Sequence, residues 1–386
     1  MHRCDSCVDV KKHIIVFFTF GVSLKTWDEV GILSREIALY TKLIDAGCDI
    51  TFVTYGDETD LEIFADNIPI TVKPIYQYTS KSKSKMLQVI KSVIAVHRMN
   101  IKDVDIIKTN QFWGSWLALY AKMLFKKPLL LRMGFEFNTF AAKQGRSPVF
   151  RTFVTKLSKL IYSCSDFVQV SSEADKNYLV AEFGLDSAKV LLRENYVDTA
   201  LFCPKKVEIV RDVLVIGRLE EQKNIFVILQ AISSLPLTLT IVGSGSLQEL
   251  VRSEAAALGI DLVMVPKINN EDLPNVINSH KVFVIASHYE GNPKVLLEAM
   301  SCGALVYANE SDGISSIVQE KSNGRFFHNI QELRNLLTKS DPEMVALKNS
   351  LGPMARELVK KNNSLDAVVK AELKTYSELT SYGHDY

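Results

Sequence analysis

Two glutamates on either side of a strand-to-helix junction are the residues of this chain best placed to do chemistry. Glu290 and Glu298 stand eight residues apart in the stretch EGNPKVLLEAMSCG, residues 290–303. The apolar residues 282–286 just before them predict a buried strand. The first carboxylate should therefore lie at the mouth of a strand, and the second about two turns into the helix that follows.

The helix after this strand is marked at both ends. Asn292 is expected to cap it, Pro293 suits its first position, and Gly303 can end it in a left-handed turn. The N–H groups at such a helix start carry about half a positive charge and bind phosphate readily. Carboxylates beside a phosphate site indicate a ligand with both hydroxyls and phosphates, although two solvated surface glutamates would give the same spacing.

A second charged pair follows another predicted strand. Residues 213–217 form an apolar run that ends in glycine, and Arg218 and Lys223 come directly after it in the sequence GRLEEQKN. Arginine donates as a planar fork and lysine acts as a point charge, and both bind phosphate oxygens. Two cations on one loop are usually surface charges. We therefore interpret these two as ligand-binding residues only in combination with the glutamate stretch.

The elements that must position these residues are those of α/β domains. In the first half, a strand at 14–18 is followed by a loop at 21–31, a helix that runs to Ile44 and a second strand at 50–54. In such domains ligands bind in the loops that follow the strands. With 386 residues and 47% hydrophobic content, the chain is long enough for two domains of this kind.

Cysteine usage and hydropathy indicate a reducing compartment and no membrane span. The six cysteines form neither a disulfide framework nor a four-ligand zinc pattern, and the one close pair is Cys4 and Cys7. The apolar run 14–20 is too short to cross a bilayer. We therefore expect a cytoplasmic protein that is soluble or peripheral at the inner face of the membrane, with no nucleic-acid partner.

Three stretches resemble one known family. The motif E-G-x-P-x-x-L-L-E-A-M-x-C-G at 290–303 is similar to the signature of the retaining glycosyltransferases of family 4. Residues 217–224 resemble the family's diphosphate loop, and 195–204 resemble its interdomain stretch N-G-V-D-x-x-x-F-x-P, with Tyr196 in place of glycine. The resemblance implies the GT-B fold, an α/β architecture of two Rossmann-like domains that face each other across a cleft.

The same resemblance implies how the chain is divided. Residues 1–197 would form an acceptor-binding domain, and residues 198–364 would form the domain that binds a nucleotide-sugar donor. Residues 365–386 would form a C-terminal helix that crosses back to the first domain.

Members of this family bind a nucleotide-diphospho sugar with the residues of these motifs. By resemblance, Arg218 and Lys223 offset the charge of the leaving diphosphate and Glu290 contacts the donor sugar, so these three are the expected catalytic residues. Glu298 would hold the ribose hydroxyls. The other expected donor contacts are Ile268, in the loop near the base, and the close backbone of Gly291, Asn292 and Pro293. The motifs leave the sugar and the base open.

The acceptor side departs from the family pattern. Relatives carry a Gly-Gly pair after the first strand, but residues 21–31 read GVSLKTWDEVG, and no histidine stands where the family often has one to touch the donor sugar. Residues 108–116 follow a strand at 106–107 and should also face the cleft. Trp27 is equally well explained as a packing residue. The residues expected on the acceptor side are Gly21, Lys25, Trp27, Asn110 and, in place of that histidine, Glu136.

No metal and no cofactor are expected beside the nucleotide-sugar co-substrate. Asp103 and Asp105 form a D-x-D pattern, but the apolar residues after them indicate a strand, so we interpret the aspartates as its solvated start. The turn Gly243-Ser244-Gly245 matches only part of G-x-G-x-x-G, which argues against a nicotinamide site.

One segment of the first half has no acidic residue from Asn67 to Lys102. Residues 81–97 within it show a helical pattern surrounded by lysines. The expected core face of this helix is Met86, Ile90, Val93 and Ile94. An ordinary solvated helix explains such a pattern, and so does a helix on an anionic membrane surface, for which the segment from Lys81 to Lys102 is the candidate.

The sequence therefore predicts a retaining, metal-independent glycosyltransferase of the hexosyltransferase type. It would move a sugar from a nucleotide-diphospho sugar to a saccharide or lipid-linked saccharide, in bacterial-type polysaccharide or glycolipid assembly. Two alternatives stay open: a sugar-nucleotide 2-epimerase of the same fold, and a catalytically inactive glycosyltransferase-like assembly partner. The missing glycine pair on the acceptor side is compatible with an epimerase, which needs no acceptor. The intact donor-site charges argue against a catalytically inactive protein.

Overall fold

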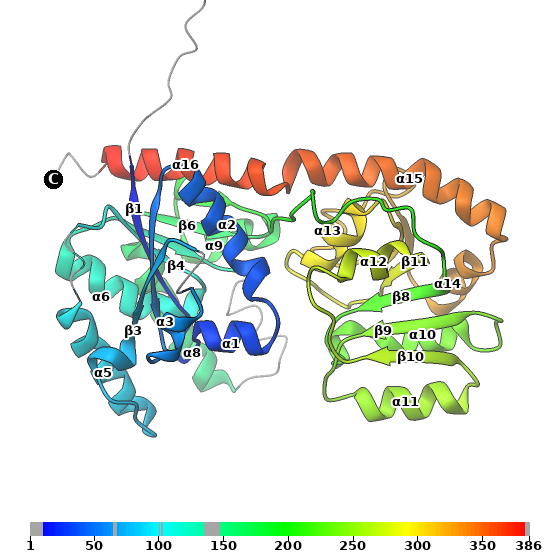
Figure 1. Cartoon of the computed structure of the whole chain (residues 1–386), viewed down its shortest axis with the longest axis horizontal. Coiled ribbons are helices and arrows are strands. Elements are labelled where there is room, and N and C mark those ends of the chain that lie inside the picture. The colour runs from blue at the N-terminus through cyan, green and yellow to red at the C-terminus, as the bar shows by residue number, and fades with distance from the viewer. Residues whose placement is uncertain (1–10, 65–67, 100, 102, 135–146, 383–386) are drawn as a thin grey trace, which may run out of the picture. The chain divides into compact units, whose positions relative to one another are not determined.

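The chain forms two compact units, each with its own parallel sheet (Figure 1). The computed structural model describes residues 11–64, 68–99, 101, 103–134 and 147–382. Cys4, Cys7 and Glu136 lie outside these residues. The first unit comprises Met1–Val170, Asp175–Leu192 and Val369–Tyr386, and the second comprises Ser171–Ala174 and Arg193–Val368.

The sheet of the first unit has the strand order β3-β2-β1-β4-β5-β6-β7 among the described residues, and every neighbouring pair is parallel. Helices cover both faces of such a sheet, which is why its strands read as continuous apolar runs. The structure confirms the expected strands at 14–18 and 50–54 to within a residue. The strands are β1 (His13–Phe17), β2 (Asp49–Thr54), β3 (Ile70–Pro74), β4 (Ile106–Thr109), β5 (Leu129–Arg132), β6 (Phe167–Val170) and β7 (Val190–Leu192).

The helices of the first unit include one that the sequence analysis missed. Residues 21–31 are not a plain loop, because α1 begins after Ser23, whose hydroxyl oxygen accepts the N–H of Thr26. The helices that lie wholly or mainly in this unit are α1 (Leu24–Glu29), α2 (Leu33–Asp45), α3 (Thr59–Glu62), α4 (Ile75–Tyr78), α5 (Lys85–Arg98), α6 (Ser115–Phe125), α8 (Pro148–Cys164), α9 (Glu173–Phe183) and α16 (Leu365–Tyr382).

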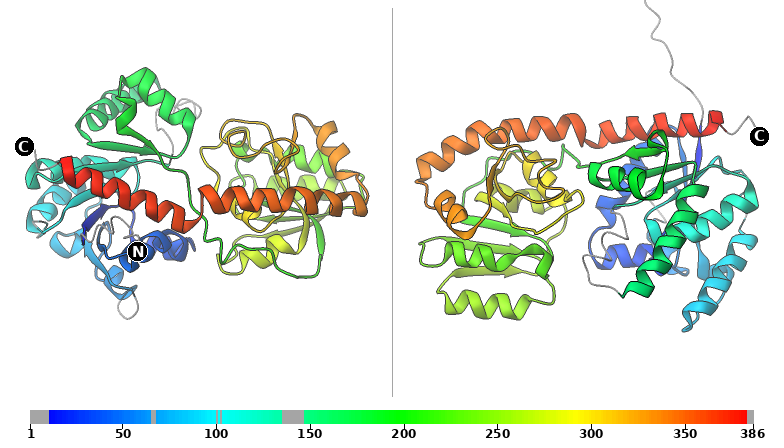
Figure 2. Two further views of the ribbon diagram at one scale, coloured as in Figure 1. Left: turned by 90° about the horizontal axis from the view of Figure 1, so that it is seen from above. Right: turned by 180° about the vertical axis from the view of Figure 1, so that it is seen from behind.

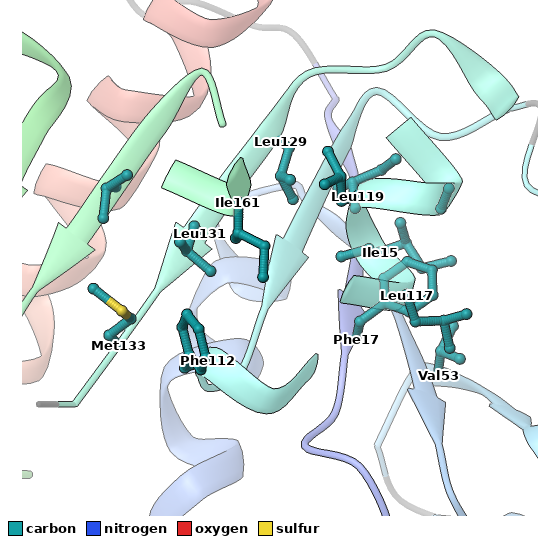
Figure 3. Close-up of a cluster of buried hydrophobic side chains, with 14 of the residues drawn as sticks. Ile15, Phe17, Val53, Phe112, Leu117, Leu119, Leu129, Leu131, Met133 and Ile161 are labelled. Atoms are coloured by element: carbon teal, nitrogen blue, oxygen red, sulfur yellow. The ribbon is translucent and has the colours of Figure 1, made fainter. Parts of the chain in front are cut away.

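One hydrophobic core joins the first sheet to α5, α6 and α8. Strand residues such as Ile15 and Leu131 meet Leu117 of α6 and Ile161 of α8 there, as Figure 3 shows. Ala95 and Val96 of α5 belong to the same cluster, and all of these side chains are buried. These three helices therefore cover one face of the sheet.

The C-terminal helix α16 packs on the first unit (Figure 2). Its Glu372 accepts a hydrogen bond from Lys108 of β4, with 2.6 Å between Nζ and Oε2, and both side chains are almost completely buried. Gln169 of β6 donates to the other carboxylate oxygen at 3.0 Å, and Tyr376 lies 3.1 Å from the Lys108 ammonium. A buried polar network thus fixes this helix on the sheet.

The second unit is built on a sheet with the strand order β10-β9-β8-β11-β12-β13, again parallel at every neighbouring pair. The strands are β8 (Arg211–Ile216), β9 (Thr238–Val242), β10 (Asp261–Val265), β11 (His280–Ile285), β12 (Leu305–Asn309) and β13 (Arg325–Phe327). The helices are α10 (Ile225–Ile232), α11 (Gln248–Ala257), α12 (Leu273–Asn278), α13 (Lys294–Ser301), α14 (Ile330–Leu337) and α15 (Asp341–Asn362).

Two buried clusters lie on the two faces of this second sheet. Val213, Val284 and Leu305 point into one cluster, whereas Leu214 and Phe283 belong to the other, as the two-residue alternation of a strand requires. Among the helices of the described residues, none combines the length and the apolar composition that crossing a bilayer would take.

Candidate functional site

The parallel order of the second sheet gathers the predicted donor residues at one edge. Because all strands run the same way, the loops after β10, β8 and β11 leave from the same end of the sheet. These loops carry Ile268, Arg218 with Lys223, and Glu290. Four residues that are far apart in the sequence are therefore displayed by neighbouring strand ends.

Lys223 and Glu290 form an ion pair at this edge. Lys223 ends the short 3₁₀ helix Glu221–Lys223, and its Nζ lies 2.5 Å from Oε1 of Glu290. The two side chains are 15% and 10% exposed, so the pair is shielded but remains reachable from solvent. Arg218, five residues earlier in the same loop after β8, is exposed. From the sequence, Lys223 is expected to bind the diphosphate and Glu290 the donor sugar. The structure shows in addition that the two side chains contact each other.

Gln222 connects the two loops that carry this ion pair. Its carbonyl oxygen accepts the N–H of His288 at 2.9 Å, and its side-chain amide donates to the carbonyl of Tyr289 at 2.8 Å. Sequence reasoning did not assign this residue a role, although it stands inside the motif that contains Lys223. Gln222 sets the distance between Lys223 and Glu290.

The glycines of the turn after β9 permit close approach to the loop after β8. A Cβ atom on Gly243 would lie 2.0 Å from the carbonyl oxygen of Gly217, and one on Gly245 would lie 2.3 Å from that of Leu219. Backbone hydrogen bonds between Leu219 and Ser244 and between Leu247 and Leu219 close this contact. The turn Gly243-Ser244-Gly245 therefore has a packing role next to Arg218, which explains its glycines without a nicotinamide site.

The Glu290 backbone rests on the turn after β12. Its N–H donates to the carbonyl of Asp312 at 2.9 Å. Gly313 follows with a φ of +79°, and a Cβ atom there would lie 2.2 Å from the carbonyl oxygen of Glu290 and 2.4 Å from that of Gly291. Only glycine fits this position, because the backbone of the donor loop lies directly against it.

The start of α13 differs from the expected cap. Pro293 rather than Asn292 occupies the N-cap position, and the proline side chain makes no capping hydrogen bond. The Asn292 side chain instead accepts the backbone N–H of Asn195 at 2.9 Å, and the Asn195 amide donates to the Asn292 carbonyl at 2.6 Å. A helix start without a side-chain cap keeps its N–H groups available to an anion.

One further contact lies at the same helix start, and a buried carboxylate follows in the helix. The Lys294 ammonium lies 4.7 Å from the ring centre of Tyr196, the residue that stands in place of the family's glycine. Glu298 lies in the interior of α13 and is only 2% exposed. A carboxylate this deeply buried on the helix that begins beside the Lys223–Glu290 pair is unusual for a surface residue and favours a binding role.

Four of the five residues expected on the acceptor side lie in the described part of the chain, around α1 and after β4. Trp27 is 5% exposed and stacks on Phe18 at a ring distance of 4.4 Å, so its packing interpretation is confirmed. Asn110 is buried after β4, and its N–H donates to the carbonyl of Phe17. Gly21 and Lys25 are exposed near α1. Glu136 falls outside the described residues.

A buried carboxylate that sequence reasoning missed organises this part of the first unit. Asp60 is fully buried and accepts hydrogen bonds from the N–H groups of Leu24 and Lys25 at 3.1 Å each, and from the Thr54 hydroxyl. It thereby caps α1 from a distance in the sequence. A Cβ atom on Gly56 would collide with it, and that glycine was the one available signal.

Two expectations near β4 have different outcomes. The carboxylate of Asp105 accepts the N–H of His13 at 2.8 Å, in agreement with its interpretation as the start of a strand. Lys108 was expected in a loop facing the cleft, and this was wrong, because it lies inside β4 with its ammonium bound to Glu372. Among the described residues, no group of three or more His, Cys, Asp and Glu side chains could hold a metal ion.

The expected core face of α5 was wrong for three of its four residues, because only Val93 packs against the core. Met86, Ile90 and Ile94 are 77%, 48% and 40% exposed. The buried residues of this helix are Gln88, Ser92, Ala95 and Val96, which lie on the opposite side. The apolar stripe that the sequence shows on α5 therefore faces outward.

Comparisons with known proteins agree with this geometry. Residues 204–339 match the family model for glycosyl transferases group 1, and residues 37–201 match the model for glycosyltransferase family 4. An uncharacterized glycosyltransferase of Methanocaldococcus jannaschii is 23% identical over 375 residues, which is 83% of this chain and 91% of that protein. The UDP-Gal:alpha-D-GlcNAc-diphosphoundecaprenol alpha-1,3-galactosyltransferase of Escherichia coli is 23% identical over 67% of this chain and 72% of its own.

Solved structures share the fold across the whole chain. Sucrose-phosphate synthase of Thermosynechococcus elongatus superposes with a TM-score of 0.75 at 19% identity, covering 97% of this chain and 100% of that one. The Anabaena HepE protein in complex with UDP and glucose gives a TM-score of 0.74 at 16% identity, covering 96% and 100%. At such identities these likenesses establish the architecture.

Proposed function

Because the chain belongs to glycosyltransferase family 4 and is thus a glycosyltransferase with the GT-B fold, we propose that its donor is a nucleotide-diphospho sugar bound by the second unit. The observation that carries this proposal is the Lys223–Glu290 pair beside the start of α13. A cation and a helix N-terminus suit the diphosphate, and Glu290 and Glu298 suit hydroxyl groups.

The proposed reaction is transfer with retention. The bond from the anomeric carbon to the diphosphate oxygen breaks, and a bond from the acceptor oxygen to that carbon forms on the same face. The acceptor proton passes to the departing phosphate oxygen. Arg218 and Lys223 offset the charge that grows on the diphosphate, which is stabilisation specific to the transition state. This route needs no metal ion and no protein nucleophile.

The two glutamates have separate proposed tasks. Glu298, buried in α13, accepts hydrogen bonds from the ribose hydroxyls. Glu290 contacts a hydroxyl of the donor sugar and at the same time orients the Lys223 ammonium, to which it is bound. Asp312, Gly313 and Asn195 keep the loop that carries Glu290 in place.

Nucleotide binding tests this proposal first. The E. coli relative is named for UDP-galactose, and the Anabaena structure contains UDP, so UDP should be screened together with GDP and ADP. A nucleotide diphosphate at about 100 times its dissociation constant adds about 2.7 kcal/mol of stability, which a thermal-shift assay detects. No shift with any of the three would contradict a nucleotide-diphosphate site.

Turnover with a panel of nucleotide sugars and a lipid extract then identifies the reaction. Transfer of the sugar or slow hydrolysis of the donor is expected. An epimerised donor would instead indicate the 2-epimerase, and the absence of any turnover would indicate the inactive assembly partner. Adding a chelator should leave the rate unchanged. A loss that magnesium or manganese restores would contradict the metal-independent route.

We further propose that the acceptor is lipid-linked and that α5 binds the inner, anionic face of a membrane. The outward stripe of Met86, Ile90 and Ile94 in a segment without acidic residues supports this. Near an anionic surface each lysine contributes on the order of 1 kcal/mol at low salt. Replacing Lys81, Lys83, Lys85 and Lys91 by Gln should release the protein from anionic vesicles, and equal flotation of both proteins would contradict the proposal.

A further inference from the structure

The helix α8 also carries apolar side chains on its outer side. Val149, Phe153 and Leu160 are 82%, 61% and 56% exposed. Their spacing of four and seven residues places them in one stripe along the helix. Phe150 beside the stripe is exposed as well. Large apolar groups that gather on one side of a helix, rather than occurring singly, mark an interaction surface.

The core does not account for this stripe. The inner side of α8 is already apolar and buried, through Val154, Ile161 and Tyr162. The Ser147 hydroxyl accepts the N–H of Phe150 and caps the helix start. The outer stripe is therefore additional to what the fold of the first unit needs.

Positive charge surrounds the outer stripe. Arg151, Lys156 and Lys159 are exposed on α8, and residues 137–165 contain no Asp or Glu. Within the part of the chain that the structure describes, none of these three cations forms an ion pair. Lys156 lies within the stripe itself, seven residues after Val149.

The same composition continues across α6 to α5. The helix α6 contacts both α5 and α8, and all three share one core on one face of the sheet. The exposed end of α6 adds Met123 and Leu124, and residues 106–135 contain no acidic residue. The outer surface of the three helices thus combines exposed apolar side chains with basic residues and contains no Asp or Glu.

We propose that α8 is a second docking element for an anionic lipid bilayer, with the side chains of Val149, Phe153 and Leu160 entering the interface between headgroups and acyl chains. A bilayer accepts apolar groups and lysines side by side, since lysine stems lie along apolar surface while the ammonium groups reach lipid phosphates. The centre of a protein interface, in contrast, is depleted of lysine. This inference rests on the proposed membrane partner of α5 but uses different residues.

Vesicle flotation of the full chain tests the role of α8. The vesicles contain roughly three parts phosphatidylcholine to one part phosphatidylglycerol. The double substitution Val149→Ser/Phe153→Ser should lower the bound fraction about fivefold or more at every salt concentration. Lys156→Gln/Lys159→Gln should lower it at low salt only, because the Debye length shrinks to about 3 Å at 1 M.

The matched control is Val345→Ser/Met354→Ser on α15 of the second unit, where the side chains are 56% and 57% exposed. This control should float as the wild type does. The UDP-induced thermal shift should be the same in all variants. This measurement tests nucleotide binding independently of membrane binding.

A spectroscopic probe distinguishes insertion from an indirect effect. Phe153→Trp should show blue-shifted emission with the vesicles and quenching by brominated lipid. Unchanged emission, or flotation of Val149→Ser/Phe153→Ser equal to the wild type, would overturn the role of α8 even if the α5 variant loses binding. Absence of flotation of the wild type itself would also overturn it and direct the search to a protein partner.

Discussion

Each unit contains a close Lys–Glu pair at a strand of its parallel sheet, and the two pairs differ in their access to solvent. In the first unit, Lys108 and Glu372 are 0% and 1% exposed. In the second, Lys223 and Glu290 are 15% and 10% exposed and lie in loops that follow strands. Lys108 is inside β4, whereas Lys223 comes after β8.

This difference separates a structural pair from one that can bind a ligand. Lys108 and Glu372 also bind Tyr376 and Gln169, so the charges are compensated by fixed neighbours. Burial, followed by the charge of Glu372, raises the pKa of Tyr376, which keeps its hydroxyl protonated. The second pair is partly exposed to solvent, so a phosphate or a hydroxyl group can reach it.

Breaking the buried pair should have the largest effect on stability. Lys108→Met leaves the Glu372 carboxylate buried without its cation, and we expect a loss of about 3–5 kcal/mol in the free energy of unfolding. The three tryptophans, Trp27, Trp113 and Trp116, all belong to the first unit, so urea unfolding followed by tryptophan fluorescence reports on it.

The double variant Lys108→Met/Glu372→Leu is the control for this prediction. It removes both charges and should recover most of the lost stability. A double variant as unstable as the single one, or a single variant as stable as the wild type, would contradict the structural role of the pair.

Breaking the accessible pair should affect turnover instead. Lys223→Ala, and likewise Arg218→Ala, should slow turnover roughly a hundredfold or more, because each removes a charge from the site of the leaving diphosphate. Circular dichroism should show that the fold is retained. Lys189→Ala, at an exposed lysine of the first unit, is the matched comparison and should have a much smaller effect. Full activity of Lys223→Ala would contradict the assignment of Lys223 to the donor site.

A methyl group at Gly313 tests how tightly the donor loop must be held. Gly313→Ala adds a Cβ atom that would collide with the Glu290 and Gly291 carbonyls, and we expect the KM for the donor to rise about tenfold. Gly259→Ala in the same unit has a similar φ of +65° with no atom within 4 Å of the added Cβ. Equal donor KM values in the two variants would show that backbone strain alone, and not the loop, is responsible.

The smallest predicted effect is a pH dependence in the second unit. His280 is buried, its Nδ1 donates to the Val276 carbonyl and its Nε2 accepts from the Thr240 hydroxyl. Burial lowers the pKa of His280, so below about pH 6.5 the unfolded chain binds the proton more readily than the folded one. Stability from the neutral ring is complete above that pH and decreases as the pH falls through the folded pKa.

His280→Gln should therefore lose less stability on acidification than the wild type does. Urea unfolding followed by circular dichroism between about pH 7.5 and 5.5 measures this difference. Parallel pH profiles of the two proteins would show that His280 is not the titrating group.

The sequence by itself determined most of the second unit. The strands before Arg218 and Glu290 are continuous apolar runs ended by glycine or a cap signal, and such local patterns do not depend on distant residues. The charged residues after them belong to motifs that resemble a family. Parallel strand order then brings their loops together, so the predicted donor residues lie at one edge of the sheet.

The first unit was predicted less well, because its decisive contacts join residues far apart in the chain. Lys108 pairs with Glu372, and Asp60 accepts N–H groups of α1 in addition to the local cap by Ser23. The core side of α5 was assigned to its apolar stripe, yet the helix buries Gln88, Ser92 and two small apolar residues. Periodicity shows that a helix has an apolar side but not whether that side meets the protein or another apolar phase.

The same limit applies inside the donor site. The sequence identified Lys223, Glu290 and Glu298, but only the tertiary structure decided that the first two form an ion pair and that Asn195 holds Asn292. Hydrogen bonds between loops depend on distances that the fold sets to within tenths of an ångström, whereas residue spacing fixes only which strand end a side chain leaves from.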